Sequence, residues 1–316
     1  MSRRWPFHPP PYPGEALSSW VNRLAHALAI PPAVLLLNVS GIPDKSTNRY
    51  HLDFDPPEHV ISTLAEKTGQ EFAAVRRLTT RGYVPTLLDT LDADRDGVAK
   101  YTNQLAFLLP LDHRPVRHPY VLPWYSFRRF HRPRGCRHCL AESAEPYLRL
   151  HWRFGWTLSC PIHKRALEPL CIRAPAVGKT EVIWLEADMS MHVVPPQLLM
   201  MDAITLDAIT GGICRLPWGY ITGALWIRLL RTVLDELGVG ATHAGTYRQT
   251  LKDLWTSVGR GYDHYLREWR PYERINQTYQ EYFMLMAAKV FADAFEQPAM
   301  QHRILEMARS DMGILP

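Results

Sequence analysis

The chain has 316 residues, of which 47% are apolar and 21% are charged, and it carries a formal net charge of +5 at pH 7. This length corresponds to two or three domains, and this composition is typical of globular proteins and excludes a disordered chain. No apolar run approaches the ~20 residues that a membrane-spanning helix requires, so we expect no membrane partner.

The N-terminal residues resemble a targeting signal only in part. The pair Arg3-Arg4 is similar to the start of a twin-arginine signal, but Pro6 and Pro9–Pro11 follow where an apolar stretch would be needed. We therefore expect a cytoplasmic protein. The five cysteines are an odd number in a reducing compartment, and they do not indicate a disulfide framework.

The first 112 residues predict a domain of short helices. Apolar residues recur at helical spacing over Leu17–Leu28, and a second helix is expected over 33–39. A third helix is expected after Pro57 and should end at Gly69, and a fourth should follow over 71–78.

The third and fourth helices, with Gly69 between them, have the order of a helix-turn-helix. Arg76, Arg77 and Arg81 would give the second helix of this pair cations that can contact phosphates. The alternative is a compact helical domain with a solvated basic end, because helix pairs joined by a glycine turn are common in proteins that do not bind DNA.

The character of the sequence changes twice further along the chain. Between about 113 and 195 helical periodicity is lost, and the alternation over 147–152 predicts a strand. Helices return after Pro196, with a continuous apolar stripe over 226–237. Further helices are expected over 246–257, 277–295 and 299–309.

Two short motifs in the middle segment carry metal-ligand spacing. Cys136 and Cys139 are separated by two residues, as are Cys160 and His163, and twenty residues lie between the two pairs. Three thiolates and one imidazole make a tetrahedral set that Zn²⁺ prefers, and a full set of four protein ligands leaves no open position for catalysis. We therefore predict a structural Zn²⁺ site; the alternative is three ordinary buried cysteines beside an exposed histidine.

The remaining two cysteines have no partner motif. Cys171 could compete as a ligand or be the remnant of a second ribbon, but no further C-x2-C follows it. We expect Cys171 and Cys214 to be small core residues. The expected fold is mainly α with a small β zinc ribbon: a helix-turn-helix-like helical domain (1–112), an arginine-rich zinc-ribbon domain (113–195) and a C-terminal helical domain (196–316).

The positive charge is concentrated next to the first cysteine pair. Residues 113–141 contain no Asp or Glu and carry +7, so the rest of the chain has a net charge of −2. Arginines interleaved with aromatic rings suit phosphate contacts and base stacking. The alternatives are a solvated basic face and a protein-binding patch. The expected nucleic-acid or partner contacts in this segment are Arg128, Arg129, Arg132, Arg134 and Arg137.

No motif of an enzyme is present. Gly178–Thr180 is similar to the end of a P-loop, but Arg173 occupies the position of its first glycine, and the residues that follow over 181–185 read as a strand. No nucleophile elbow, metalloprotease motif or dinucleotide fingerprint occurs, and we expect a protein that is not an enzyme.

Two segments together resemble a known family. Pro13–Trp20, followed by Arg23–Ala25, resembles the opening of the TniQ/TnsD family of transposition proteins. Tyr147–Trp152 and Leu167, placed around the two metal-ligand pairs, are similar to the zinc-finger core of the same family. The resemblance covers about residues 10–170, and the last 120 residues match only in being helical.

The resemblance implies a target-selection adaptor that performs no chemistry itself. Such proteins recruit an AAA+ ATPase of the TnsC or TniB type, which licenses a transposase at a chosen site. Some members bind a DNA site, and others dock on a CRISPR effector complex, often as homodimers. Members often carry additional C-x-x-C ligands, whereas this chain has only Cys171, so the resemblance does not extend to a second metal site.

Two other functions remain as alternatives. One is a stand-alone, sequence-specific DNA-binding target selector or regulator that uses the helix-turn-helix and the zinc ribbon. The other is a zinc-dependent nuclease or transferase, which the lack of an open coordination position disfavours.

Overall fold

The structure is a computed structural model, mostly helical with small antiparallel sheets. It describes residues 4–40, 52–53, 56–83, 134–173, 181–185, 193–240, 242, 244–262, 272, 275 and 277–312. The chain divides into two compact units. The first draws its described residues from 1–84, 127–154 and 167–189, and the second from 155–166 and 190–316.

The first unit begins with a group of short helices around an apolar core. These are α1 (Leu17–Ala27), α2 (Pro32–Ser40), α4 (Glu58–Thr68), α5 (Phe72–Arg76) and the 3₁₀ turn η1 (Thr80–Tyr83). The apolar residues whose spacing predicted α1 face the interior, since Leu17, Trp20 and Leu24 are all completely buried. The four predicted helices are thus present, and their packing against one another forms this core.

The predicted helix-turn-helix order is present as α4, a glycine and α5, but its second helix is short. Gly69 ends α4 with a φ of 70°, in the left-handed region that glycine adopts without strain. Helix α5 has five residues and ends at Arg76, whereas the sequence predicted a helix over 71–78. The chain turns before Leu78 because the backbone N–H groups of Leu78 and Thr79 bond to the carbonyls of Val75 and Arg76, three residues back.

The rest of the first unit is built on a three-stranded antiparallel sheet in the order β1 (Arg134–Gly135), β4 (Glu168–Arg173), β5 (Glu181–Trp184). Helix α7 (Arg137–Glu142) follows β1. Gly135 lies so close to the neighbouring residues that a Cβ atom there would be 2.7 Å from the Leu170 side chain. The strand predicted over 181–185 is confirmed as β5.

The strand predicted over 147–152 is wrong. Only one β-bridge forms, between Glu15 and Arg149, and residues Leu150–Arg153 make the 3₁₀ helix η3. The bridge cannot extend into a ladder because its partner segment enters α1 at Leu17. The alternation in the sequence therefore reflects burial of Leu148, Leu150 and Trp152 rather than strand pairing.

The second unit combines a short hairpin with a helical body. The hairpin pairs β2 (Ser159–Cys160) with β3 (Arg165–Ala166), and α8 (Pro196–Thr210) begins at the predicted boundary near 196. The sequence did not predict the hairpin of β6 (Ile213–Leu216) and β7 (Gly219–Thr222) that follows α8. The remaining elements are α9 (Gly223–Leu237), η4 (Gly245–Tyr247), α10 (Arg248–Ser257), α12 (Gln277–Glu296) and α13 (Pro298–Met312).

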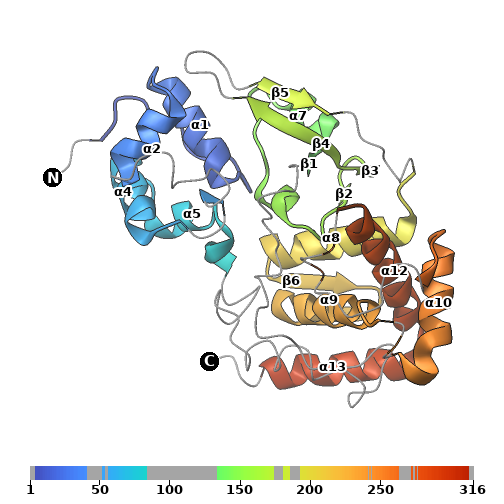
Figure 1. Cartoon of the computed structure of the whole chain (residues 1–316). Helices are drawn as coiled ribbons and strands as arrows, with labels where there is room; N and C mark the ends of the chain where they lie inside the picture. Colours follow the sequence, from blue (N-terminus) through green and yellow to red (C-terminus); the bar gives the residue numbers. More distant parts are fainter. Residues whose placement is uncertain are drawn as a thin grey trace. The chain divides into compact units, whose positions relative to one another are not determined.

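The C-terminal helices agree with the predicted ranges within a few residues, and α8, α9 and α12 pack against one another (Figure 1). Aromatic rings fill the contact, with the Trp226 ring centroid 4.7 Å from that of Phe291.

In the part of the chain that the structure describes, no single helix is long and apolar enough to cross a membrane, and only α1 and α2 together, bent by 107°, pass that test of length and composition. The predicted three-domain layout remains a prediction, because its boundary at 112 lies outside the described residues.

Candidate metal centre and the charged networks

The first pair of predicted ligands lies at the start of a short helix. Cys136 is the N-terminal capping position of α7, and Cys139 lies in its first turn. The Leu140 N–H donates to the Cys136 carbonyl at 3.1 Å, which closes the turn between the two cysteines. Cys136 is 2% exposed and Cys139 is 5% exposed, so both thiols face the interior.

The second pair lies on the hairpin formed by β2 and β3. Cys160 ends β2, and the chain turns back through Lys164, whose φ is 53° and whose N–H donates to the Cys160 carbonyl at 2.7 Å. The preceding residue fixes the hairpin to the helical body, because the Ser159 N–H donates to Asp202 Oδ2 on α8 at 2.7 Å and the Ser159 hydroxyl bonds to the same oxygen. Asp202 is 1% exposed, so this anchor is shielded from water.

The structure brings the four predicted ligands together into a group that could hold one metal ion. One ligand atom from each of Cys136, Cys139, Cys160 and His163 lies within 4.8 Å of the others. Cys160 Sγ and His163 Nδ1 are 3.6 Å apart. A tetrahedral Zn²⁺ with the usual bond lengths requires about 3.6 Å between a sulfur and a nitrogen ligand, so this pair fits the ion.

The two other cysteines lie outside this group, and they differ from each other. Cys214 is completely buried, as predicted, and burial, with Asp207 nearby, raises the pKa of its thiol to about 12. Cys171 is exposed, so its prediction as a core residue is wrong. The cause is the alternation of β4: Leu170 faces the interior, which turns its neighbour Cys171 outward.

The predicted arginine contacts are only partly described by the structure. Arg128, Arg129 and Arg132 lie outside the described residues, and of Arg81 only the backbone is described. Arg134 lies half-buried in β1. Arg137 pairs with Glu168, at 2.8 Å between nitrogen and oxygen, and its guanidinium lies 4.4 Å from the Trp184 ring centroid.

The arginines of the helix pair differ in exposure. Arg76 is half-buried, and its Nε has no hydrogen-bond partner among the described residues. Arg77 is exposed at the end of α5. Arg76, Arg77, Arg134 and Arg137 are thus the predicted contacts whose side chains the structure describes, and all eight contacts stay predictions.

A charged network that the sequence did not predict holds the N-terminal end of α1. The carboxylate of Glu15 is completely buried and accepts hydrogen bonds from the Tyr12 N–H at 2.9 Å, the Ser19 hydroxyl at 2.9 Å and the Arg23 guanidinium at 2.7 Å. Desolvation raises the pKa of Glu15, while these donors act in the opposite direction. Arg23 also pairs with Glu145, at 3.0 Å between Nε and Oε2.

A second buried carboxylate, Asp53, binds the same helix end. It accepts the Ser18 N–H at 2.6 Å and the Ser18 hydroxyl at 2.8 Å, and it pairs with Arg153 at 3.2 Å. Burial is the main cause that raises the pKa of Asp53, and the Arg153 charge opposes it. Two carboxylates at the start of a helix also interact favourably with the helix dipole.

Comparison with known protein families decides the assignment of this chain. The TniQ family model matches residues 6–167, which is half of the chain. The chain belongs to the TniQ family. No curated protein matches it, and no solved structure matches it.

Membership in the TniQ family implies a transposition-associated protein of a class of accessory proteins that are generally not catalytic. The matched range contains both ligand pairs and both buried networks. The buried networks give the first motif of the family resemblance a physical role. Its residues Glu15, Ser18, Ser19 and Arg23 form the hydrogen bonds and the ion pair that hold the start of α1. A charged pair eight residues apart at the start of an apolar helix is the signal that would have indicated this network.

Proposed function

We propose that this protein is a target-selection adaptor that links a target nucleoprotein to an AAA+ ATPase regulator of a transposase. The observation that carries the proposal is the TniQ match over residues 6–167. The expected partners are an ATPase of the TnsC or TniB type on one side and a CRISPR effector complex or target DNA on the other. The protein works in the cytoplasm, and a homodimer is the assembly expected when the target is an effector complex.

The metal in this proposal is a structural Zn²⁺ ion held by Cys136, Cys139, Cys160 and His163. Three buried thiol groups and an imidazole at the spacing of a tetrahedral site support zinc over a hard cation such as Mg²⁺, which prefers oxygen ligands. The bound ion supplies a cross-link between the helix α7 and the β2–β3 hairpin. All four positions are taken by the protein, which supports a role in folding rather than in turnover.

Two observations support an adaptor over a stand-alone reader of DNA sequence. Helix α5 has five residues, which is little length for a recognition helix that must lie in a major groove. Arg137, predicted as a contact, is already bound to Glu168 and stacked on Trp184. An adaptor needs surfaces for proteins more than side chains aimed at base edges.

The test is a reconstitution of the full chain with an AAA+ ATPase of the TnsC or TniB type and with the subunits of a CRISPR effector complex. We expect the tagged protein to retain the ATPase and the effector subunits on a resin, with or without target DNA. Retention of neither protein partner, in a sample with one zinc per chain and a cooperative unfolding transition, would contradict the proposal. Cys171→Ser serves as the matched control for cysteine variants, because Cys171 is outside the metal-ligand group.

The second candidate is a site-specific DNA-binding protein, favoured by the order α4, Gly69, α5 and by the exposed Arg77. This function predicts that the free protein binds one DNA site about 10³-fold more tightly than random DNA. An adaptor binds DNA weakly, without sequence preference and with a steep dependence on salt. Competition binding with the transposon attachment site at two salt concentrations separates the two.

A further inference from the structure

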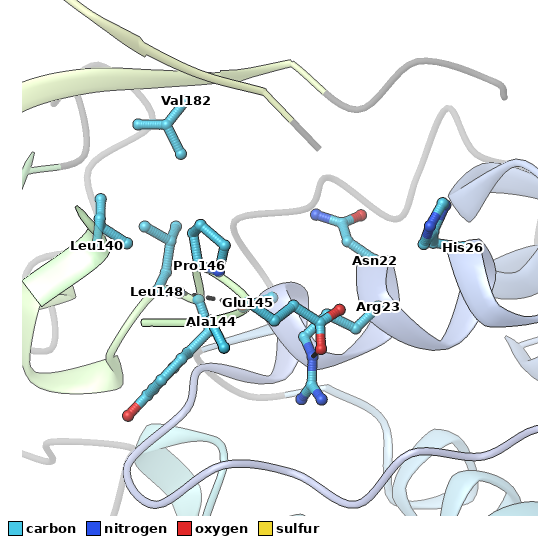
Figure 2. Close-up of a pocket in the computed structure, with 11 residues that line it drawn as sticks. Asn22, Arg23, His26, Leu140, Ala144, Glu145, Pro146, Leu148 and Val182 are labelled. Carbon is cyan, nitrogen blue, oxygen red and sulfur yellow. Dashed lines mark hydrogen bonds and ion pairs between the residues drawn. The ribbon is translucent and has the colours of Figure 1, made fainter. Parts of the chain in front are cut away.

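A pocket in the first unit has one polar wall that comes from a single face of α1. Its volume is about 330 Å³. Ser19, Asn22, Arg23 and His26 line it at positions i, i+3, i+4 and i+7, which place four side chains on one stripe of a helix. Figure 2 shows Asn22 projecting from this helix toward the space that Val182 borders on the other side.

Asn22 lines this pocket, and its hydrogen-bonding capacity is unused among the described residues. It is 8% exposed, and its side-chain amide has no hydrogen-bond partner among the described residues. A polar side chain buried to this degree is normally bonded, and the Asn22 amide atoms, which keep some contact with solvent, are open to a ligand. The amide presents one acceptor and two donor hydrogens to whatever enters the pocket.

The opposite walls of the pocket are apolar and lie beside an open strand. Leu140, Pro146, Leu148 and Val182 form them. Val182 belongs to β5, which pairs only with β4 among the described strands. The backbone groups on the outer side of an edge strand can bond to an added extended segment, whose alternate side chains then enter pockets next to the strand.

The charges around the pocket favour a cationic ligand. Arg23 is already bound by two carboxylates, Glu15 and Glu145. The Glu145 side chain is 44% exposed, and Glu181, next to Val182 in β5, is exposed. His26 is also exposed on the rim. The rim thus presents acidic groups to solvent, which repels phosphates and attracts lysine or arginine.

We propose that this pocket binds an extended peptide segment of a protein partner, in which an aliphatic side chain is flanked by basic residues. The aliphatic side chain fills the space between Leu140, Pro146 and Val182, and a main-chain amide of the peptide bonds to Asn22. The flanking cation pairs with Glu145. This site is additional to the proposed transposition function and does not depend on it.

The probe for this site is the capped peptide acetyl-Gly-Lys-Leu-Lys-Gly-amide, titrated into the full-length protein and followed by ¹⁵N NMR. We expect saturable binding with shifts of the Asn22 side-chain amide. A peptide with Ser in place of Leu should bind at least ~10-fold more weakly, because burial of a leucine side chain corresponds to that factor or more. A peptide with Glu in place of both Lys residues should also bind at least ~10-fold more weakly at low salt.

Two variants of the protein test the location of the site. Asn22→Leu keeps the branched shape of the side chain with a larger volume and removes the amide, and it should weaken binding of the Leu peptide about 10-fold. Asn38→Leu is the matched control, because Asn38 is exposed on α2, and it should leave binding unchanged. If Asn22→Leu impairs folding, Ala144→Trp replaces it: Ala144 is exposed at the pocket, and a tryptophan there should abolish binding by filling it.

Three results would overturn the proposal. The first is equal affinity for the Leu and Ser peptides, and the second is unchanged binding to both Asn22→Leu and Ala144→Trp. The third is tighter, Asn22-dependent binding of the single-stranded oligonucleotide (dA)10, since an asparagine amide also matches the edge of adenine. Failure of the ATPase pull-down would leave these peptide measurements unaffected, so the two proposals are tested separately.

Discussion

Helix α1 in the first unit and helix α12 in the second are both buried, but different contacts hold them. The start of α1 is bound by two buried carboxylates, Glu15 and Asp53, which pair with Arg23 and Arg153. Helix α12 is held by ring contacts with its neighbours, including those of Phe291 and Phe295 with Trp226 on α9. Helix α1 is thus held by hydrogen bonds and ion pairs between specific atoms, whereas α12 is held by the packing of apolar side chains.

The family match covers residues 6–167, which include both buried ion pairs at the start of α1, and it does not reach the C-terminal helices. A buried ion pair fails when either partner is replaced, because the other charge is left without compensation. An aromatic core tolerates many exchanges that keep its volume and pattern. Buried ion pairs therefore restrict particular positions to particular residues and appear as a motif. An aromatic core restricts only the spacing of apolar residues.

The largest effect is expected when ligands of the proposed metal site are removed. We expect Cys136→Ser combined with Cys139→Ser to lower the zinc content from one per chain to about zero. The segment around the site should lose most of its folding free energy, because Zn²⁺ binding supplies on the order of 10 kcal/mol in small zinc domains, and residues around both ligand pairs should lose protection from hydrogen exchange. Metal analysis and hydrogen exchange measure this directly. Unchanged zinc content and unchanged melting in the double variant, with Cys171→Ser as the control, would show that these cysteines hold no structural metal.

The next test compares one substitution in each unit. Arg153→Met removes the charge that compensates Asp53 and should cost about 3 kcal/mol at pH 7.5. Part of this loss should disappear when the measurement is repeated at pH 5, because burial raises the pKa of the isolated carboxyl and so favours its protonation as the pH falls. Phe291→Leu should cost only about 1 kcal/mol, with no dependence on pH. Urea denaturation at both pH values checks this, and equal, pH-independent losses would remove the distinction between the two units.

Helices such as α1 and α9 could be predicted from the sequence because each carries an apolar stripe on one face. The stripe over 226–237, for example, contains Trp226, Leu230 and Val233, all of which are completely buried in α9. The four metal ligands could be predicted for a similar reason, since two-residue spacing within each pair is a local pattern. In both cases the information lies within a few residues of the chain.

The contacts that position these elements could not be predicted in the same way. Asp53 is 35 residues from Ser18, and nothing in the local pattern of either residue indicates the other. The failed strand over 147–152 has the same origin, because its only partner segment becomes α1 after a single bridge. Where a distant partner decides the structure, the local pattern gives burial correctly and backbone pairing incorrectly.

Within the first unit, a buried histidine and two buried carboxylates should give stability opposite dependences on pH. His151 is 7% exposed, and burial, assisted by Arg149, lowers its pKa to about 3 in the folded protein. The unfolded chain binds a proton near pH 6.5, so stability should fall as the pH decreases from 6.5 toward 3, by at most ~1.4 kcal/mol per pH unit. The raised pKa values of Glu15 and Asp53 act in the opposite direction, because their folded-state carboxyls bind protons more readily.

His151→Leu isolates this histidine from the carboxyls. Relative to the variant, the unmodified protein should lose about 2 kcal/mol of stability between pH 6.5 and 4.5, measured by urea denaturation at fixed salt. Parallel stability curves for the two proteins over this range would show that His151 is not kept neutral by burial.

The smallest effect concerns the two cysteines outside the metal group, one in each unit. Cys171 is exposed on β4, whereas Cys214 is buried in β6 with a thiol pKa of about 12, so at pH 8 only about 10⁻⁴ of it is thiolate. An alkylating reagent should therefore modify Cys171 within minutes in the native protein and Cys214 only after unfolding, as peptide mass spectrometry would record. Modification of both at equal rates would mean that the second unit opens readily. In that case its aromatic core would not be the close-packed contact that distinguishes it from the first unit.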